Sequence, residues 1–243
     1  MNYKFNPEHT FFTSDTHFNH TNIIRYCNRP FKDVNQMNEA LIENWNGVIG
    51  PDDTVFHLGD FCLGGAAEWT KILDRLNGKI YLILGNHDLK NLRQGFTYRF
   101  ELVTMQMHIE IGKQRIWLNH FPFLCFDGGY KSNVWQLFGH VHTRKNSTGI
   151  DADRLQHLYP TQYDVGVDNN DFTPISFEQL KSMPLGTVPF GSFVKNEPNG
   201  TVPNGTLKNH LTYSPYFHVS PSDRQISPTP HLSGLLSRRN KSL

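Results

Sequence analysis

The sequence has no run of 18 apolar residues, so we expect no transmembrane helix. Its first ten residues lack an apolar segment (MNYKFNPEHT), and we therefore expect no secretory signal. There are three cysteines, Cys27, Cys62 and Cys125, with no C-x-x-C pair among them. This sparse, odd set argues against a disulfide framework and favours a cytoplasmic protein.

The sequence also lacks an excess of charge of either sign. The 23 lysines and arginines nearly balance the 22 aspartates and glutamates, which leaves a net charge of +1 with histidine neutral. Charge therefore gives no argument for nucleic acid or an anionic membrane as a partner. Hydrophobic residues make up 37% of the chain, enough for one substantial core. Histidine is abundant, with 13 residues, and several of them follow short apolar runs.

The composition changes near residue 185. Residues 186–243 contain seven of the fourteen prolines, eight serines and five asparagines, without sustained hydrophobic periodicity. Such a segment cannot bury enough apolar surface to offset the entropy lost on ordering. We therefore predict a folded domain over residues 1–185 and a mostly irregular tail over residues 186–243.

Within residues 1–185, apolar runs of strand length alternate with helix-like stretches. The predicted strands are His9–Ser14, Thr54–Leu58, Lys79–Leu84, Glu101–Ile111, Gln114–Asn119, Trp135–Phe138 and Gln162–Val167. The predicted helices are Asn35–Ile49, Ala66–Asn77 and Ser176–Met183. Early βα alternation followed by hairpins predicts an α/β fold with a sandwich of two sheets.

Polar residues able to bind metal ions follow five of these segments. They are Asp15, His17, Asp60, Asn86, His87, Asp88, His120, His140 and His142. Side chains at strand ends converge in α/β sheets, and oxygen and imidazole ligands suit manganese, iron or zinc. Even seven of these nine side chains would be too many for one tetrahedral zinc, so the pattern favours two ions that share a carboxylate.

These motifs, in this order, resemble the calcineurin-like metallophosphoesterase superfamily. They are Asp15-Thr16-His17, Gly59-Asp60, Gly85-Asn86-His87-Asp88, His120 and Gly139-His140-Val141-His142. The resemblance implies a four-layer α/β/β/α fold, a two-sheet sandwich flanked by helices. It also implies hydrolysis of phosphoesters by a hydroxide that bridges two divalent ions, with manganese expected and iron, zinc or nickel as alternatives.

The resemblance assigns a role to each residue of the motifs. The first ion would be held by Asp15, His17 and His142, the second by Asn86, His120 and His140, and Asp60 would bridge them. His87 would donate a proton to the leaving-group oxygen. Asp88 would accept a hydrogen bond from the other nitrogen of His87 and fix its orientation.

Other residues near the motifs are open to two readings. His20 is a candidate contact to the substrate phosphate or a solvated loop residue. Arg25 is a candidate substrate contact or a partner in a surface salt bridge. His57, in the middle of a predicted strand, is expected to be a hydrogen-bonded core residue rather than a ligand.

Several motif positions differ from those of better-known branches of the superfamily, and these differences narrow the range of expected substrates. Asp60 is followed by F-C-L-G-G, and Asp88 stands where the serine/threonine phosphatases have Glu, which argues against a protein phosphatase. Leu63 occupies the tyrosine position of purple acid phosphatases, and nothing after Met183 has the hydrophobic content of a nuclease capping domain. The chain resembles the compact bacterial and phage-type phosphodiesterases, which act on small phosphodiesters or nucleotides. A phosphomonoesterase and a catalytically silent binding scaffold are the alternatives.

Overall fold

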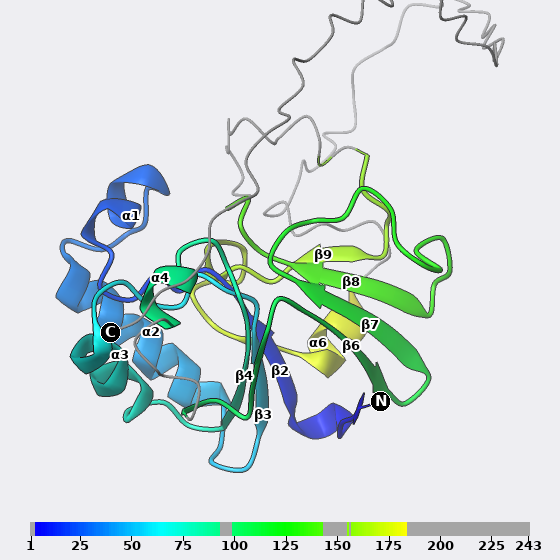
Figure 1. Ribbon diagram of the computed structural model, residues 1–243, viewed down its shortest axis with the longest axis horizontal. Coiled ribbons are helices and arrows are strands. Elements are labelled where there is room, and N and C mark those ends of the chain that lie inside the picture. The colour runs from blue at the N-terminus through cyan, green and yellow to red at the C-terminus, as the bar shows by residue number, and fades with distance from the viewer. Residues whose placement is uncertain (1–2, 93–98, 143–154, 156, 184–243) are drawn as a thin grey trace, which may run out of the picture. The chain divides into compact units, whose positions relative to one another are not determined.

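The computed structural model describes residues 3–92, 99–142, 155 and 157–183. These residues form two five-stranded sheets with flanking helices (Figure 1). The predicted α/β sandwich of two sheets flanked by helices is confirmed. The proposed tail, residues 186–243, lies outside the described residues, and the boundary at residue 185 stays a prediction.

The first sheet has the strand order β1-β6-β7-β8-β9. Its strands are β1 (Tyr3–Lys4), β6 (Gln106–Ile111), β7 (Gln114–Asn119), β8 (Val134–Phe138) and β9 (Gln162–Asp164). β6 and β7 form the predicted antiparallel hairpin, and the other pairs are parallel. The hairpin turns at Gly112, whose φ of +60° is readily adopted by a residue without a Cβ.

The second sheet has the strand order β10-β2-β3-β4-β5. Its strands are β2 (Thr10–Thr13), β3 (Thr54–His57), β4 (Lys79–Ile83), β5 (Leu102–Thr104) and β10 (Ile175–Ser176). β2 to β5 are mutually parallel, and β10 is antiparallel to β2. The parallel order places the C-terminal ends of β2, β3 and β4 at one edge of this sheet.

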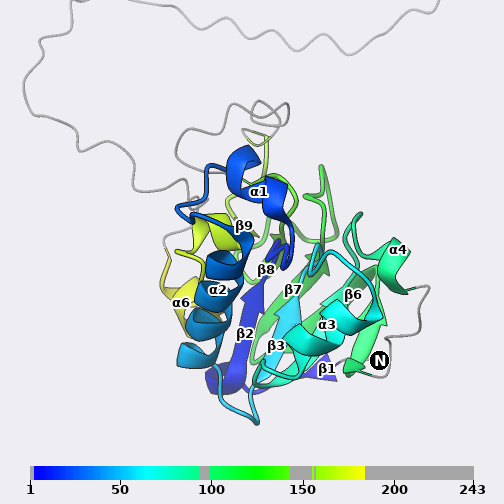
Figure 2. The same ribbon diagram turned by 90° about the vertical axis from the view of Figure 1, so that its left-hand side faces the viewer.

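Helices complete the described structure. They are α1 (Thr21–Tyr26), α2 (Val34–Val48), α3 (Ala66–Leu73), α4 (Leu89–Leu92) and α6 (Phe177–Ser182), with 3-10 turns η1 (Pro7–His9) and η3 (Val167–Asn169). Figure 2 shows α2 and α3 lying over β2 and β3. α6 begins with a capping box, in which the Ser176 hydroxyl accepts from the Gln179 N–H at 3.1 Å.

The hydrophobic core has two clusters, because successive side chains along a strand point to opposite faces of the sheet. In β3, Val55 faces a cluster shared with α2 and α3, whereas its neighbour Phe56 faces the cluster between the sheets. Both side chains are fully buried. Trp45 anchors α2 because its indole N–H donates to the Asn77 carbonyl at 2.9 Å. The second sheet is therefore covered on both faces.

The structure corrects several predicted boundaries. Residues 101–111, predicted as one strand, form β5 and β6 in different sheets, and Met105 between them is 62% exposed. Both halves are apolar, so their hydrophobicity could not show the crossing. α3 ends at Leu73 rather than at Asn77. The short elements β1, α1, α4 and β10 were not predicted.

Candidate metal centre

The predicted ligands follow strands that end at one edge of the two sheets. Parallel β2, β3 and β4 send their following loops to the same side, and these loops carry Asp15, Asp60 and Asn86. In the first sheet, parallel β7 and β8 bring His120 and His140 toward Asp60. Residues distant in sequence thus meet because the strand order places their loops together.

The loops of the centre adopt an unusual backbone conformation. The Asp15 N–H donates to the Gly59 carbonyl at 2.9 Å, and the His17 N–H donates to the Asp60 carbonyl at 3.0 Å. Left-handed φ values occur at Asp15 (57°), His17 (50°), Asp60 (56°), His140 (70°) and His142 (44°). Such conformations cost about 1–3 kcal/mol each and cluster at functional sites, where the surrounding structure enforces them.

Two motif glycines are required because carboxylates pack against their backbone. A Cβ on Gly139 would overlap the Ser14 hydroxyl and an Asp15 oxygen, and a Cβ on Gly85 would overlap an Asp60 oxygen. The glycines of G-N-H-D and G-H-x-H therefore make room for the two carboxylates. This explains in steric terms why each motif begins with glycine.

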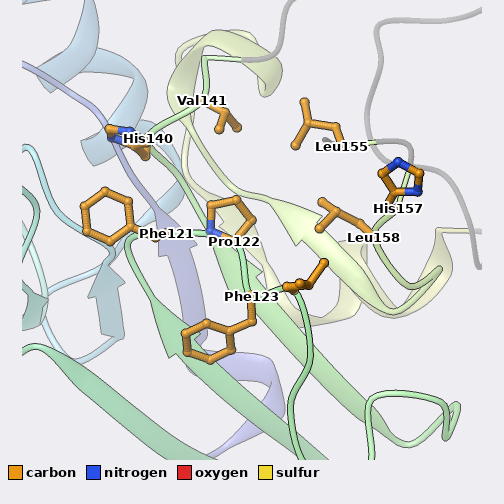
Figure 3. Close-up of a pocket in the computed structure, with 9 residues that line it drawn as sticks. Phe121, Pro122, Phe123, His140, Val141, Leu155, His157 and Leu158 are labelled. Carbon is orange, nitrogen blue, oxygen red and sulfur yellow. The ribbon is translucent and has the colours of Figure 1, made fainter. Parts of the chain in front are cut away.

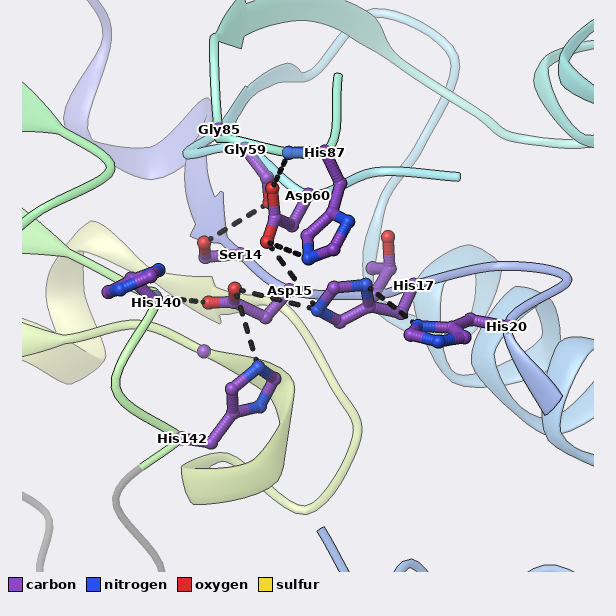
Figure 4. Close-up of polar contacts among 12 residues, drawn as sticks. Ser14, Asp15, His17, His20, Gly59, Asp60, Gly85, His87, His140 and His142 are labelled. Atoms are coloured by element: carbon purple, nitrogen blue, oxygen red, sulfur yellow. Dashed lines mark hydrogen bonds and ion pairs between the residues drawn. The ribbon is translucent and has the colours of Figure 1, made fainter. Parts of the chain in front are cut away.

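Asp15, His17 and His142 form a first group of facing donor atoms (Figure 4). Asp15 Oδ1 lies 4.0 Å from His17 Nε2 and 3.8 Å from His142 Nε2. Asp15 and His17 are each 1% exposed, and these two atoms have no hydrogen-bond partner among the described residues. Buried polar atoms without partners are costly, and a bound cation would satisfy both.

Asp60, His120 and His140 form a second group. Asp60 Oδ2 lies 3.6 Å from His120 Nε2 and also 3.6 Å from His17 Nε2, which belongs to the first group. Asn86 completes this side, because its Oδ1 lies 3.1 Å from His120 Nε2. The Asp60 carboxylate therefore stands between the two groups.

The donor set and its spacing fit divalent ions. Ligands bound to one ion at about 2.0–2.2 Å lie roughly 3–3.5 Å apart. The donor atoms of each group lie within 4.8 Å of one another, so small shifts of the side chains would bring them to one ion. The His120 Nδ1–H points to the Leu58 carbonyl at 2.7 Å, which leaves Nε2 as a lone-pair donor toward Asp60. The residues present thus fit two cations bound side by side.

Two residues that the sequence reasoning missed, Arg29 and Asp168, support the first group. Asp168 accepts from His142 Nδ1 at 2.8 Å, and its two oxygens accept from Arg29 Nε and Nη2 at 3.0 and 2.8 Å. Arg29 also donates to the carbonyls of Thr16 and Asp15 at 2.9 and 2.7 Å. Burial would raise the pKa of Asp168, but the hydrogen bond from His142 and the Arg29 charge outweigh it and lower the pKa to about 2.

Asp168 fixes the His142 ring, as carboxylates commonly do for metal-binding histidines. Its position just after β9 was a usable signal, since the other candidate residues also follow strands. Arg29 gave no comparable signal. It lies in an irregular stretch after α1, and its role depends on a partner 139 residues away.

His87 and Asp88 occupy different surroundings, and Asp88 differs from its predicted role. The His87 side chain is 47% exposed, and its Nε2 lies 3.9 Å from Asp60 Oδ2. The buried Asp88 carboxylate instead accepts three backbone N–H bonds, from Asp60 and Gly85 at 2.8 Å and from Phe61 at 2.9 Å. Asp88 thus holds the backbone around Asp60 and Gly85, whereas the prediction had it orienting the His87 ring.

His20 lies at the centre and Arg25 does not. His20 Nδ1 lies 3.5 Å from His17 Nδ1, and its ring centroid is 6.1 Å from that of His87. Burial lowers the pKa of His20, and the charge of His87 adds to the effect. Arg25 is exposed and its guanidinium lies 5.2 Å from the Tyr26 ring centroid.

His57 is the core histidine that the sequence predicts. It is fully buried, its Nε2 is hydrogen-bonded to the Thr16 hydroxyl at 2.9 Å, and its Nδ1 accepts from the Gly59 N–H at 3.2 Å. Burial lowers the pKa of His57 to about 3, so the ring is neutral. It ties the loop after β2 to the end of β3.

The centre thus has two parts. Its buried floor comprises four residues that are 0–2% exposed, Asp15, His17, Asp60 and His120. Its open rim comprises His20, Asn86 and His87, which are half-buried or exposed. Fold and floor together define an α/β two-sheet protein with a candidate site for two metal ions.

The comparisons with known proteins agree with this class. A model of the calcineurin-like phosphoesterase family matches residues 9–179, and the chain belongs to this family. An uncharacterized protein of Methanocaldococcus jannaschii is 36% identical over 173 residues, which cover 69% of this chain and 86% of that protein. The resemblance predicted from the motifs is confirmed.

Two further relatives are more distant. The gene 66 protein of Mycobacterium phage L5 is 29% identical over 180 residues, which cover 59% of this chain and 86% of that protein. A solved structure of a protein of unknown function from Aquifex aeolicus matches with a TM-score of 0.54 and 28% identity. It covers 71% of this chain and 97% of its own.

Among the residues that the structure describes, no helix is both long and apolar enough to cross a membrane.

Proposed function

We propose that this protein hydrolyses phosphodiesters at a centre of two divalent ions. One observation carries the proposal: the Asp60 carboxylate oxygen lies 3.6 Å from a donor nitrogen of each ligand group. A carboxylate in this position can bind both ions. The first ion would be held by Asp15, His17 and His142, and the second by Asn86, His120 and His140.

Two bound divalent ions would supply positive charge at the phosphoryl oxygens and would lower the pKa of the attacking water. These oxygen and imidazole ligands would accept manganese, iron, zinc or nickel, and manganese is the ion that the family resemblance leads us to expect. The chain's own contribution is to fix the donors. Arg29 and Asp168 hold the Asp15 and His142 side of the centre through the hydrogen bonds described above.

We assign His87 the role of proton donor to the leaving-group oxygen. Its imidazole is near Asp60 but 47% exposed, so it can reach a substrate that lies over the ions. Its backbone N–H donates to Asp60 Oδ1 at 2.9 Å, which places the residue beside the shared carboxylate. His20, on the same side, would contact the phosphate.

The two arginines Arg25 and Arg29 have other contacts, and this favours a phosphodiester substrate over a phosphomonoester. A dianionic terminal phosphate is commonly bound by a guanidinium. Arg29 is fully engaged with Asp168 and two backbone carbonyls, and Arg25 contacts the Tyr26 ring. Among the described residues, neither of these arginines is directed at the substrate side of the centre.

The test is hydrolysis by metal-stripped protein after addition of Mn, Zn, Fe(II) or Ni, one at a time. Bis(4-nitrophenyl) phosphate should be cleaved and 4-nitrophenyl phosphate should be cleaved more slowly. Bound metal, measured by mass spectrometry, should approach two ions per chain. Faster cleavage of the monoester would favour a phosphomonoesterase. Two bound ions without hydrolysis of either compound would indicate a binding scaffold.

We also infer a cytoplasmic location, which the sparse cysteines support.

A chain that lacks residues 186–243 should keep its metal content and its melting temperature. A collapse of the melting temperature on truncation would contradict the proposed irregular tail.

A further inference from the structure

An apolar pocket adjoins the proposed metal centre at His140 (Figure 3). It has a volume of about 510 Å³, within the usual range for small-molecule sites. Its apolar lining comes mainly from the segment after β7 and from the residues before β9: Phe121, Pro122, Phe123, Leu124, Leu155 and Leu158. Among the described residues that line it, His140 and His157 carry the only ionisable side chains.

The pocket and the metal centre share a wall. His140 belongs to the second ligand group and also lines the pocket. Its ring centroid lies 4.6 Å from that of Phe121, which in turn lies 4.9 Å from the His120 ring. A group attached to a phosphorus atom over the ions could therefore enter the pocket directly.

The pocket lies away from the proposed leaving-group side. His87 packs near His17 and His20, at ring distances of 5.4 and 6.1 Å. In Figure 4, His140 lies on the opposite side of Asp15 from His20. A leaving group protonated by His87 would thus depart away from the pocket, which is free to hold the ester group that stays on phosphorus.

We propose that the pocket binds a planar aromatic group on the retained ester arm of a phosphodiester substrate. This inference rests on the proposed function. Among the described residues, the lining offers no Lys, Arg, Asp or Glu side chain to a sugar phosphate or a peptide. Phe121, 42% exposed, presents an aromatic face beside His140. Leu124, 80% exposed, extends the apolar surface at the opening. A nucleobase and a simple aryl group share this chemistry.

The test compares 4-nitrophenyl phosphodiesters that share one leaving group and differ in the retained group. The retained groups are methyl, cyclohexyl, phenyl and thymidin-5′-yl. We expect kcat/KM to rise about tenfold or more from methyl to phenyl, the range of aromatic stacking, and phenyl to exceed cyclohexyl. The phenyl and thymidin-5′-yl compounds distinguish a simple aryl group from a nucleobase.

Two variants locate the effect. Leu124→Asp and Leu158→Asp place a charge in the pocket lining and should remove most of the phenyl preference while methyl ester turnover persists. Tyr130→Asp is the matched control, since Tyr130 is 77% exposed in the same loop and does not line the pocket. Calorimetric binding of phenyl methylphosphonate, against methyl methylphosphonate, gives a readout that needs no turnover.

The outcomes separate this inference from the proposed function. Equal rates for all retained groups, or a phenyl preference that survives both pocket variants, would overturn the pocket assignment and leave the hydrolytic proposal standing. A cyclohexyl ester preferred over phenyl would overturn the aromatic character of the substrate. Failure to cleave any of the diesters with metal bound would instead contradict the proposed function.

Discussion

The floor and the rim of the metal centre differ in how the fold holds them. Floor residues are buried and lie on strained backbone or directly after strands. In three of them the atom that faces away from the other donors is hydrogen-bonded: Asp15 Oδ2 accepts from the His140 N–H, Asp60 Oδ1 accepts from the His87 N–H, and His120 Nδ1 donates to the Leu58 carbonyl. The rim residues His20 and His87 have one side in solvent and few fixed contacts. The difference suggests a division of labour: the floor sets metal binding and stability, and the rim handles the substrate.

Replacing Asp60 should have the largest effect. Asp60→Asn removes the charge that both ions would share, so we expect metal content to fall from two ions per chain toward one or none. Hydrolysis of bis(4-nitrophenyl) phosphate should drop by about 10³-fold or more, since both ions act on the reacting oxygens. Metal analysis and single-substrate kinetics provide the measurement. Unchanged turnover would contradict the role of Asp60 as the carboxylate that both ions share.

Replacing His87 should affect turnover without affecting metal binding. His87→Gln should lower kcat by about 10²–10⁴-fold if the imidazole is the proton donor, while metal content and melting temperature stay at the level of the unmodified protein. The loss should be larger for a diester with an alkoxide leaving group than for one that releases 4-nitrophenolate, which needs no proton. An equal loss for both leaving groups would argue against proton donation.

The third prediction tests the support under the floor. Asp168→Asn keeps the volume but leaves the buried Arg29 charge without its partner. We expect a loss of about 3–5 kcal/mol in the free energy of unfolding and a 10–100-fold weaker affinity for one of the two ions. Chemical denaturation of the chelated protein and metal titration measure the two effects separately.

A control for this prediction is Glu39→Gln, which breaks the exposed pair between Glu39 and Arg75. Water and salt screen exposed pairs of this kind, so they contribute little to stability. If Asp168→Asn proved as mild as this control, the Arg29–Asp168 pair would not support the centre.

Sequence reasoning succeeded where one local pattern carries the information. The position of Asp15, Asp60 and Asn86 just after β2, β3 and β4 was predictable, because each follows an apolar run. It failed where the determinant is tertiary. The division of residues 101–111 between two sheets and the Arg29–Asp168 pair both depend on partners far along the chain. Asp88 was misassigned because a motif position does not show which way a carboxylate points.

The smallest predicted effects concern the rim and the residue beside it. His20→Ala removes one contact to His17 and a proposed contact to the phosphate, so KM should rise about fivefold with metal content unchanged. Arg25→Ala is the matched control from the adjacent helix, where the guanidinium contacts the Tyr26 ring. It should change KM by less than about twofold and the free energy of unfolding by less than about 0.5 kcal/mol. A larger effect at Arg25 than at His20 would move the substrate site toward α1. Loss of metal in His20→Ala would instead show that His20 takes part in metal binding. The proposed difference between floor and rim would then not hold.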